Sequence, residues 1–266
     1  MRAFFFDIDE TLLDHKTWCV PSETQKALIA LKAQGDLIYL NTARGFSELQ
    51  NVQQQISFCS FDGLILSDGA QFLSDKLQWS RYLPESANDL ISSLEQANIN
   101  FRWESCSGIY YQHPPQEEQR QLLERLFGFC PTVSKYSGAP LLRLVFYADH
   151  QTVHQLRTHF PQLRFVESNG QLVNVLAAGC GKAPAMLEVA HYMGIETDRT
   201  IAFGDGPIDR TMLLRAGLGI AMGNADAETK CCADYVTDAV GELGIWNACL
   251  HYGFLQGEKN ETYCDC

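Results

Sequence analysis

The sequence lacks several features that would assign a protein of 266 residues to a class at once. No apolar run approaches the roughly 20 residues of a membrane-spanning helix, and Asp7 interrupts the apolar N-terminal stretch before it reaches the length of a signal peptide. Lys and Arg form no cluster and the formal net charge is −12, so the electrostatic footprint of a nucleic-acid-binding protein is missing. We find no internal repeat and no low-complexity segment. These absences predict a cytoplasmic protein with no membrane and no nucleic-acid partner.

The composition is that of an ordinary globular protein. Hydrophobic residues make up 46% of the chain and charged residues 20%. The length allows one large domain or two smaller ones, each with a sizeable core. The oligomeric state is not encoded in any feature of this sequence.

The most informative stretch lies near the N-terminus. An apolar run short enough to be a buried strand ends in two aspartates and a threonine, in the order Phe4-Phe5-Phe6-Asp7-Ile8-Asp9-Glu10-Thr11. In open parallel α/β sheets, reactive groups collect just beyond the carboxyl ends of the strands. Asp7 and Asp9 either share a face, as residues i and i+2 of a strand do, or Asp9 turns into the loop and offers its backbone carbonyl. Both arrangements gather oxygens that suit Mg²⁺, which takes few carboxylates plus water and phosphate oxygens.

Three more motifs of this kind follow along the chain. Each stands at the end of a strand-like run or at the start of a helix-like one, and together they supply a hydroxyl, cations and acids: Asn41-Thr42-Ala43-Arg44, Gly181-Lys182 and Gly204-Asp205-Gly206-Pro207-Ile208-Asp209. We expect these groups to meet at one edge of a parallel sheet. The set indicates a metal and phosphate site.

The order of the expected elements predicts an α/β protein with a doubly wound, Rossmann-like parallel sheet. Strands at 3–7, 37–41 and 62–66 alternate with helices, one that starts near Ser22 and one at about 46–56. Ser22 and Gln25 have the spacing of a capping box, and Gly35 suits the C′ position of the first helix. The alternation resumes with helix 182–193, strand 200–204, helix 209–216, strand 218–222 and helix 225–232.

The segment between these two halves has a different pattern. Helices near 85–97, 116–128 and 150–160 mix with strands near 99–103, 108–112, 141–147, 163–168 and 171–176. Asn169-Gly170 predicts a hairpin turn between the last two strands. We therefore expect a discontinuous catalytic core of residues 1–80 and 178–266, with an α+β cap of residues 81–177 inserted as a lid. Hinge motion is expected at the two crossings.

Specificity should come from this cap, because the core recognises only phosphate. Five cap residues are considered for the cleft: Trp103, Glu104, Tyr110, Tyr111 and Arg143. Since strand alternation sends about half of such a set inward, each of the aromatic residues is expected in the core of the cap.

The four motifs resemble motifs one to four of the haloacid dehalogenase superfamily. The long gap between the second and third motifs, and the run Gly217-Leu218-Gly219-Ile220-Ala221-Met222-Gly223-Asn224-Ala225, resemble its Cof-type subfamily with a large inserted C2-type cap. The resemblance covers residues 1–80 and 178–247. It implies a Mg²⁺-dependent phosphatase that hydrolyses phosphate monoesters of small metabolites, such as sugar phosphates, nucleotides or phosphorylated cofactors.

The catalytic roles implied by this resemblance belong to Asp7, Asp9 and Lys182. Asp7 is the candidate nucleophile, which forms an aspartyl phosphate and so splits one difficult step into two. Asp9 would protonate the leaving oxygen and then activate water. Acting as an acid near neutral pH requires an Asp9 pKa above the ordinary value of about 3.9, which Asp7 would favour and a cation would oppose.

The binding roles are distributed over the other motifs. Thr42 and Lys182 would hold the transferring phosphoryl oxygens, and Ala43 and Arg44 complete the substrate-binding set, although an arginine at this position also suits a bridge to an acid at the sheet edge. The expected metal ligands are Asp7, Asp9, Asp205 and Asp209. Asp209 would act through water, or it would orient Lys182.

Four residues depart from the pattern of the superfamily. It usually has Gly at Ala43, Asn at Asp68, Asn at Ile208 and Asp at Leu243. Ile208 matters most, because an apolar side chain replaces a polar group close to the expected metal, and such groups tune metal affinity. Weaker catalysis, or a degenerate protein that binds a phosphorylated metabolite without turnover, is therefore an alternative.

Two further alternatives use the same groups. A phosphomutase or phosphotransferase would form the same aspartyl phosphate but pass the phosphoryl group to a sugar hydroxyl. A phospho-receiver also combines an acceptor Asp, acidic metal ligands, a hydroxyl and a Lys on a doubly wound sheet. The long insert and Thr11 after Asp9 argue against a receiver.

Overall fold

The computed structural model describes residues 1–168 and 171–255. Their largest feature is an eight-stranded sheet in the order β13-β12-β11-β1-β2-β3-β4-β5. The strands from β13 to β3 run parallel, and β4 and β5 extend the sheet antiparallel at one edge. In sheet order they are Tyr235–Val236 (β13), Leu218–Ala221 (β12), Thr200–Gly204 (β11), Ala3–Phe6 (β1), Leu37–Asn41 (β2), Gly63–Leu66 (β3), Gln71–Leu73 (β4) and Gln78–Ser80 (β5).

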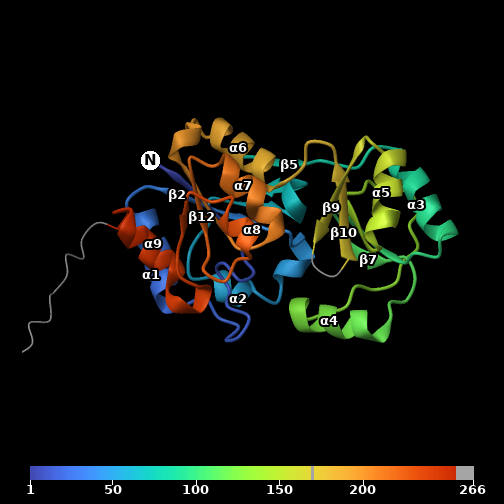
Figure 1. The fold of residues 1–266 in the computed structure, drawn as a ribbon, viewed down its shortest axis with the longest axis horizontal. Helices are drawn as coiled ribbons and strands as arrows, with labels where there is room; N and C mark the ends of the chain where they lie inside the picture. The colour runs from blue at the N-terminus through green and yellow to red at the C-terminus, as the bar shows by residue number, and fades with distance from the viewer. Residues whose placement is uncertain (169–170, 256–266) are drawn as a thin grey trace, which may run out of the picture.

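Helices cover both faces of this sheet because its central strand is apolar on both. The buried side chains of Phe4 and Phe6 pack against α1 and α9, whereas Phe5 packs against α6 and α7. Figure 1 shows α1 with α9 and α6 with α7 as two helix pairs around the sheet. The helices are Ser22–Ala33 (α1), Gly244–His251 (α9), Lys182–Tyr192 (α6) and Arg210–Arg215 (α7). The fold class predicted from the sequence, a doubly wound α/β core, is confirmed.

Short helices complete the connections of the large sheet. The α-helical turns are Gln53–Ile56 (α2) and Ala227–Lys230 (α8), and the 3₁₀ turns are Phe46–Leu49, Ser67–Gly69, Thr197–Arg199, Pro207–Asp209 and Val240–Glu242. The strand order reverses between β1 and β11, since the chain builds the sheet outward through β2 and returns to the other side of β1. Such a switch point opens a crevice at the carboxyl ends of the two strands.

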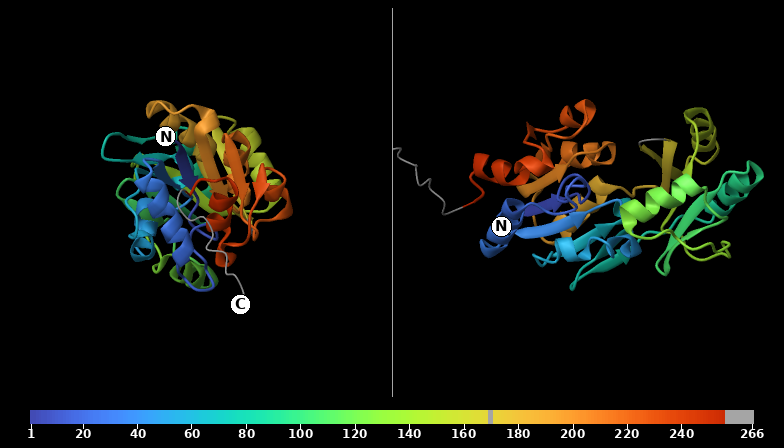
Figure 2. Two further views of the ribbon diagram at one scale, coloured as in Figure 1. Left: turned by 90° about the vertical axis from the view of Figure 1, so that its left-hand side faces the viewer. Right: turned by 90° about the horizontal axis from the view of Figure 1, so that it is seen from below.

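A second sheet lies between β5 and α6 in the chain, and we call residues 87–177 the inserted unit. Its five strands are antiparallel in the order β7-β6-β8-β10-β9. They are Gly108–Tyr111 (β7), Phe101–Ser105 (β6), Arg143–Tyr147 (β8), Leu172–Ala177 (β10) and Leu163–Ser168 (β9). Its helices are Ala87–Gln96 (α3), Glu117–Phe127 (α4) and His150–His159 (α5). Figure 2 shows the inserted unit beside the large sheet along the long axis of the molecule.

The helices of the inserted unit have different partners. Leu90 of α3 and Val153 of α5 share a core with Phe101 and Phe146 of its sheet. Figure 1 shows α4 apart from these two helices. Its last turn contacts the loop after β2, where the carbonyl of Leu126 accepts a hydrogen bond from Asn51 (2.8 Å). Helix α4 therefore belongs to the boundary between the inserted unit and the large sheet.

Several local predictions need correction. Pro21 occupies the N-cap of α1, so Ser22 lies inside the first turn and donates to Glu23 (2.7 Å), and the predicted capping box is wrong. Gly35, with a φ of +85°, confirms the predicted C′ position. The helix expected at 46–56 is two short turns, because Glu48 points inward and accepts from the backbone N–H of Gly45 (2.8 Å).

Other differences concern elements that the sequence did not indicate. The antiparallel strands β4 and β5 and helix α9 were not predicted. The Asn169-Gly170 turn lies outside the described residues, although β9 and β10 pair antiparallel as expected. None of the described helices has the length and hydropathy that a bilayer-crossing segment requires.

The stability of the large sheet should depend on the aromatic side chains at its centre. Phe203 is fully buried and stacks on Phe6 with ring centroids 4.9 Å apart. We expect Phe203→Ala to lower the free energy of unfolding by about 3–5 kcal/mol, because the cavity it leaves adds to the lost burial. Urea denaturation measures this change. Leu214→Ala at a 63% exposed position is the control and should stay within about 0.5 kcal/mol of the parent.

Candidate active site

The switch point of the large sheet carries three carboxylates. Asp7 follows β1 directly, Asp205 follows β11, and Asp209 ends the 3₁₀ turn after it. One oxygen from each lies within 4.8 Å of the others. Adjacent parallel strands thus bring together the first and fourth sequence motifs, as the sequence predicts.

The third motif joins them through Lys182, the first residue of α6. Its Nζ donates to Oδ1 of Asp7 and to Oδ1 of Asp209, both at 2.6 Å. The side chain is 2% exposed. Asn41 at the end of β2 donates to the carbonyl of Lys182 (3.0 Å), which ties the start of α6 to the sheet. An ammonium in this position draws two acids toward one point.

Asp209 also shapes the loop that carries Asp205. Its Oδ2 accepts from the backbone N–H groups of Asp205 (3.1 Å) and Gly206 (3.0 Å). A Cβ on Gly204 would lie 2.5 Å from that of Asp209, so only glycine fits there. Thr11, the threonine of the first motif, donates to Oδ1 of Asp205 (3.0 Å). The loop is therefore held in one shape by hydrogen bonds to the acids themselves.

These acids carry more negative charge than one lysine balances. Burial raises the pKa of Asp7 well above its ordinary value; Lys182 opposes this shift, and the charges of Asp209 and Asp205 reinforce it. Burial, followed by the charge of Asp209, raises the pKa of Asp205 to about 7. Burial alone would lower the pKa of Lys182, but Asp209 and Asp7 outweigh it and raise that pKa, so the ammonium stays charged.

A divalent cation fits this excess of charge. Oδ2 of Asp205 accepts no hydrogen bond from the described residues, and hard cations prefer such a free carboxylate oxygen. Asp7 and Asp209 each offer one further oxygen to the same point, so the donor set suits a metal held by Asp7, Asp205 and Asp209. A metal on Oδ1 of Asp7, the oxygen next to Lys182, leaves Oδ2 open. The Asp9 carboxylate lies outside this group.

Asp9 is instead paired with two cationic or titratable groups. Arg44 donates to both of its oxygens, from Nε at 2.8 Å and from Nη2 at 2.6 Å, and Nε2 of His15 lies 2.7 Å from Oδ1. Burial alone would raise the pKa of Asp9, but the hydrogen bonds from Arg44 and His15 hold it well below its usual range. In this arrangement Asp9 is ionised, which is the opposite of the state that a general acid needs.

The second motif supplies the other predicted binding residues. Thr42 is fully buried, and its Oγ1 accepts from the backbone N–H of Arg44 (3.1 Å). The carbonyl of Ala43 accepts from Nη1 of Arg143 (2.6 Å), a residue of the inserted unit. Besides Asp9, Arg44 donates to the carbonyl of Glu48 (2.7 Å), so the guanidinium bridges the loop to the acid.

A buried charge cluster joins the inserted unit to this loop. Arg143 of β8 forms ion pairs with Glu104 of β6 and with Glu48 of the loop, and Ser67 donates to Glu104 (2.9 Å). A Cβ on Gly45 would overlap the Glu104 carboxylate, so the loop has no side chain where the inserted unit approaches. Glu104 and Arg143, considered for the cleft, thus fasten the two parts together.

Two of the three aromatic residues lie in the core of the inserted unit, as expected. Trp103 is buried and stacks on half-buried Tyr110 with ring centroids 4.5 Å apart, and its indole Nε1 donates to the carbonyl of Ser134 (2.8 Å). The expectation is wrong for Tyr111. It is buried, but strand alternation puts it on the opposite face of the sheet, where its ring lies 6.0 Å from the Arg102 guanidinium.

A cavity of about 470 Å³ lies against the acids. Its floor includes Asp7, Asp9, Asp205 and Asp209, and Arg102 and Tyr147 of the inserted unit line it from the other side. Most of the remaining lining is apolar and comes from α4, β10 and the loop after β11: Leu122, Leu123, Leu126, Phe127, Leu172, Pro207 and Ile208. The departure at Ile208 therefore adds an apolar side chain to the cavity wall.

A further departure, Asp68, has a backbone reason. Its φ of +54° is left-handed, a region that Asn and Asp tolerate better than most residues. The carboxylate is buried, and neither oxygen accepts a hydrogen bond from residues 1–168 or 171–255. Burial raises the pKa of Asp68, with Lys182 and Arg143 opposing the shift.

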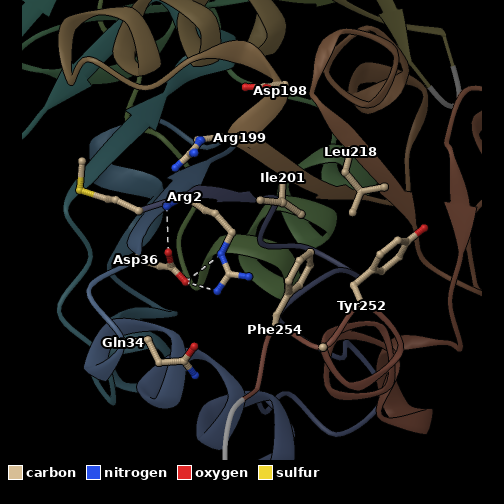
Figure 3. Close-up of a pocket in the computed structure, with 11 residues that line it drawn as sticks. Arg2, Gln34, Asp36, Asp198, Arg199, Ile201, Leu218, Tyr252 and Phe254 are labelled. Atoms are coloured by element: carbon tan, nitrogen blue, oxygen red, sulfur yellow. Dashed lines mark hydrogen bonds and ion pairs between the residues drawn. The ribbon is translucent and has the colours of Figure 1, made fainter.

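Another hollow lies at the opposite edge of the large sheet. Its volume is about 650 Å³, and its lining includes residues at the amino ends of the central strands, among them Arg2, Ile201 and Leu218. Figure 3 shows the Arg2 guanidinium turned toward Asp36, to which Nε donates (3.1 Å) and with which Nη2 forms an ion pair. The charge of Arg2 is thus satisfied within the protein, and this hollow is separate from the acidic site.

The sequence of the chain matches the haloacid dehalogenase-like hydrolase family over residues 4–249. The chain belongs to this family. The superfamily predicted from the four motifs is therefore confirmed.

Several relatives of this family member are named as phosphatases. The putative phosphatase YkrA of Bacillus subtilis (strain 168) is 26% identical over 261 residues, which are 96% of this chain and 99% of that protein. The 5-amino-6-(5-phospho-D-ribitylamino)uracil phosphatase YcsE of the same organism is 25% identical over 256 residues, 95% of this chain and 96% of that protein. The solved structure of the HAD subclass IIB sugar phosphatase BT4131 superposes on this chain with a TM-score of 0.86 and 28% sequence identity. The superposition covers 95% of this chain and 99% of the BT4131 chain. These comparisons confirm the predicted class of enzyme, a phosphatase.

Three residues of this hydrolase's site escaped the sequence analysis. His15 contacts Asp9, Glu48 anchors the loop of the second motif, and Arg102 lines the cavity. His15 lies four residues after Thr11, and that proximity was the available signal. Glu48 lies three residues after Gly45, from whose backbone N–H it accepts a hydrogen bond, and that spacing was its local signal. Arg102 has none, because the cavity that it lines is formed by segments far apart in the sequence.

Metal binding to this hydrolase should strengthen as the pH rises through about 7. Below that pH a proton competes for Asp205, whose pKa is raised to about 7. A carboxyl whose pKa rises on folding stabilises the fold at low pH and loses that contribution as the pH rises through the folded value. Without divalent cations we therefore expect the Tm to fall from about pH 6 to about pH 8. Added MgCl₂ should offset this fall.

Differential scanning fluorimetry measures the Tm, and calorimetric titration measures the Mg²⁺ affinity at both pH values. Asp205→Asn is the control, since it removes the titrating group and should make both quantities nearly independent of pH in this range. A Mg²⁺ affinity of the parent that is equal at both pH values would contradict the assignment of Asp205.

Proposed function

We propose that the chain is a Mg²⁺-dependent phosphatase that hydrolyses phosphate monoesters of small metabolites through an aspartyl-phosphate intermediate. One observation carries the proposal: Asp7 places Oδ1 on Lys182, keeps Oδ2 free of hydrogen bonds from the described residues, and lines the cavity. A carboxylate fixed by one oxygen and open at the other is oriented for attack. The phosphatase relatives support the same activity.

In the first step, Oδ2 of Asp7 attacks phosphorus and the bond from phosphorus to the ester oxygen breaks. The leaving alkoxide takes a proton and departs as the alcohol. Lys182 lies 2.6 Å from Oδ1 of Asp7, where it offsets charge on the phosphoryl group, and Thr42 offers a hydroxyl from the end of β2. A Mg²⁺ ion held by Asp7, Asp205 and Asp209, with the backbone carbonyl of Asp9 as a further ligand, would neutralise phosphoryl charge.

In the second step, water attacks the aspartyl phosphate, inorganic phosphate leaves and the Asp7 carboxylate is restored. The proton of that water passes to Asp9, which the contact with Arg44 keeps ionised. Protonation of the leaving alkoxide in the first step requires Asp9 to carry a proton. We therefore propose that Asp9 separates from Arg44 during the first step, because the pair lowers its pKa.

We further propose that residues 81–177 act as the cap of a discontinuous core, residues 1–80 and 178–266, and determine which alcohol is accepted. The support is the cavity lining, in which α4, Arg102 and Tyr147 face the acids of the large sheet. A cytoplasmic location and the absence of a nucleic-acid partner stay predictions from the sequence.

The alternatives give different products. Inorganic phosphate released from the ester supports hydrolysis, whereas a phosphate moved to a second hydroxyl without release supports a mutase or transferase. A phospho-receiver would keep its aspartyl phosphate for minutes. A protein that binds the ester without release would be the degenerate form that Ile208 suggested.

Asp7→Asn should reduce Mg²⁺-dependent phosphate release by about a thousandfold or more, because an amide replaces the attacking carboxylate. Phosphate release is measured with a panel of phosphorylated metabolites, with and without Mg²⁺. Intact-protein mass spectrometry of the acid-quenched parent should show one added phosphoryl group, which the variant lacks.

Asp75→Asn, the same change at an exposed position, is the control and should keep the parental rate. Phosphate release by Asp7→Asn at the parental rate would show that Asp7 is not the nucleophile.

A further inference from the structure

We infer that the cavity next to Asp7 selects phosphate monoesters whose alcohol carries a flat, apolar ring with an anionic oxygen acceptor directed at Arg102. The inference rests on the proposed function and narrows its substrate class. It is carried by the chemistry of the cavity wall opposite the acids.

The wall contributed by α4 is apolar. Leu122 and Leu126 form one i,i+4 pair and Leu123 and Phe127 form the next, so the four side chains make one broad apolar surface, and all four line the cavity. The remaining turns of α4 that face solvent are charged, as at Glu118 and Arg125. An apolar face turned toward an acidic site has no catalytic use, but it binds an apolar part of a substrate.

A second apolar surface stands on the loop after β11. Pro207 and Ile208 line the same cavity next to Asp205 and Asp209. A ring that enters the cavity with its phosphate on Asp7 contacts both this loop and α4. Rings bury a large area with few rotatable bonds, so they suit walls of this kind.

The position of α4 is fixed by the site itself. The carbonyl of Leu126 accepts from Nη2 of Arg44 (3.3 Å) and from Asn51 (2.8 Å), and the Arg44 guanidinium lies 5.0 Å from the centroid of the Phe127 ring. The apolar face is therefore held over the acids by the residue that binds Asp9. It is a built part of the site.

Arg102 supplies one cation on the cap side of the cavity, which it lines. It is 5% exposed, and none of the described residues accepts a hydrogen bond from its Nη1. Oε1 of Glu48 forms an ion pair with Nη1 at 3.6 Å, longer than a hydrogen bond, while Oε2 of that carboxylate contacts Gly45 and Arg143. A guanidinium at the cavity wall binds an oxygen acceptor, and a carboxylate gives the strongest bond.

A sugar phosphate matches most of this lining poorly. Each hydroxyl that leaves water needs a new hydrogen bond, and leucine, phenylalanine, proline and isoleucine side chains offer none. Glu10, Arg102 and Tyr147 are the polar side chains other than the aspartates among the described lining residues. The volume of about 470 Å³ lies within the range of small-molecule sites. A phosphorylated ring of one metabolite fits it.

Three primary alkyl phosphates test the inference, because they share the bond that breaks and differ in the alcohol: benzyl phosphate, 4-carboxybenzyl phosphate and ribose 5-phosphate. Acetyl phosphate, whose leaving group is too small to reach α4, reports the proposed chemistry by itself. With Mg²⁺, we expect kcat/KM for benzyl phosphate to exceed that for ribose 5-phosphate about tenfold, and the carboxylate to add about tenfold more.

Two variants locate these preferences. Arg102→Met should remove the advantage of the carboxylate, and Leu122→Gln should remove the advantage of the ring over ribose. Arg125→Met and Glu118→Gln, at exposed positions of α4, are the matched controls and should keep both ratios. Circular dichroism confirms that each variant is folded.

The outcomes separate the two proposals. The inference is overturned, and the proposed function stands, under two conditions: acetyl phosphate is hydrolysed, and kcat/KM for ribose 5-phosphate equals or exceeds that for benzyl phosphate. A carboxylate advantage that survives in Arg102→Met overturns the role of Arg102. If the protein hydrolyses neither acetyl phosphate nor any of the three esters, the proposed function and the inference are both overturned.

Discussion

The site depends on three carboxylates, two buried and one half-buried, held around a single ammonium. Parallel strands on either side of the switch point deliver Asp7 and Asp205, and the turn after β11 returns Asp209 to the same place. Lys182 balances only part of their charge, so the pKa values of Asp7 and Asp205 are raised. This repulsion costs stability on its own. The affinity for a cation, the dependence on glycine at 204 and the open oxygen of Asp7 all follow from it.

The loop of the second motif connects this charge to the inserted unit. Arg44 contacts Asp9 on one side and the last turn of α4 on the other. Arg143 reaches from β8 to the carbonyl of Ala43 and to Glu48. Both arginine side chains are buried, where the low dielectric strengthens ion pairs and makes an unpaired partner costly. The inserted unit and the loop beside the acids therefore share one set of charges.

Much of the large sheet and the acids of the site could be predicted from the sequence. Strand ends are local features, and parallel strands must end at the same edge, so Asp7, Asp205 and Lys182 were expected to meet. The pair of Asp9 with Arg44 and the position of α4 could not be predicted. They depend on contacts between segments 35 or more residues apart, for which one sequence carries no local signal.

The same distinction explains the smaller errors. The capping box was predicted from the spacing of Ser22 and Gln25. In the structure the N-cap is one residue earlier, at Pro21, because Ser22 already has helical backbone geometry. The helix expected at 46–56 was interrupted because Glu48 is committed to the cluster with Arg143. In both places a requirement of the surrounding fold overrode a local pattern.

The Arg143 cluster has a consequence for the evolution of this enzyme. Because Glu48 and the carbonyl of Ala43 belong to the part of the chain that forms the large sheet, and Arg143 and Glu104 belong to the inserted unit, the two parts are not interchangeable modules. A lineage that acquired a different insert would also need substitutions in the turn from Ala43 to Glu48. The inserted unit and this turn therefore change together during evolution, and the residues at 48, 104 and 143 should covary among homologues.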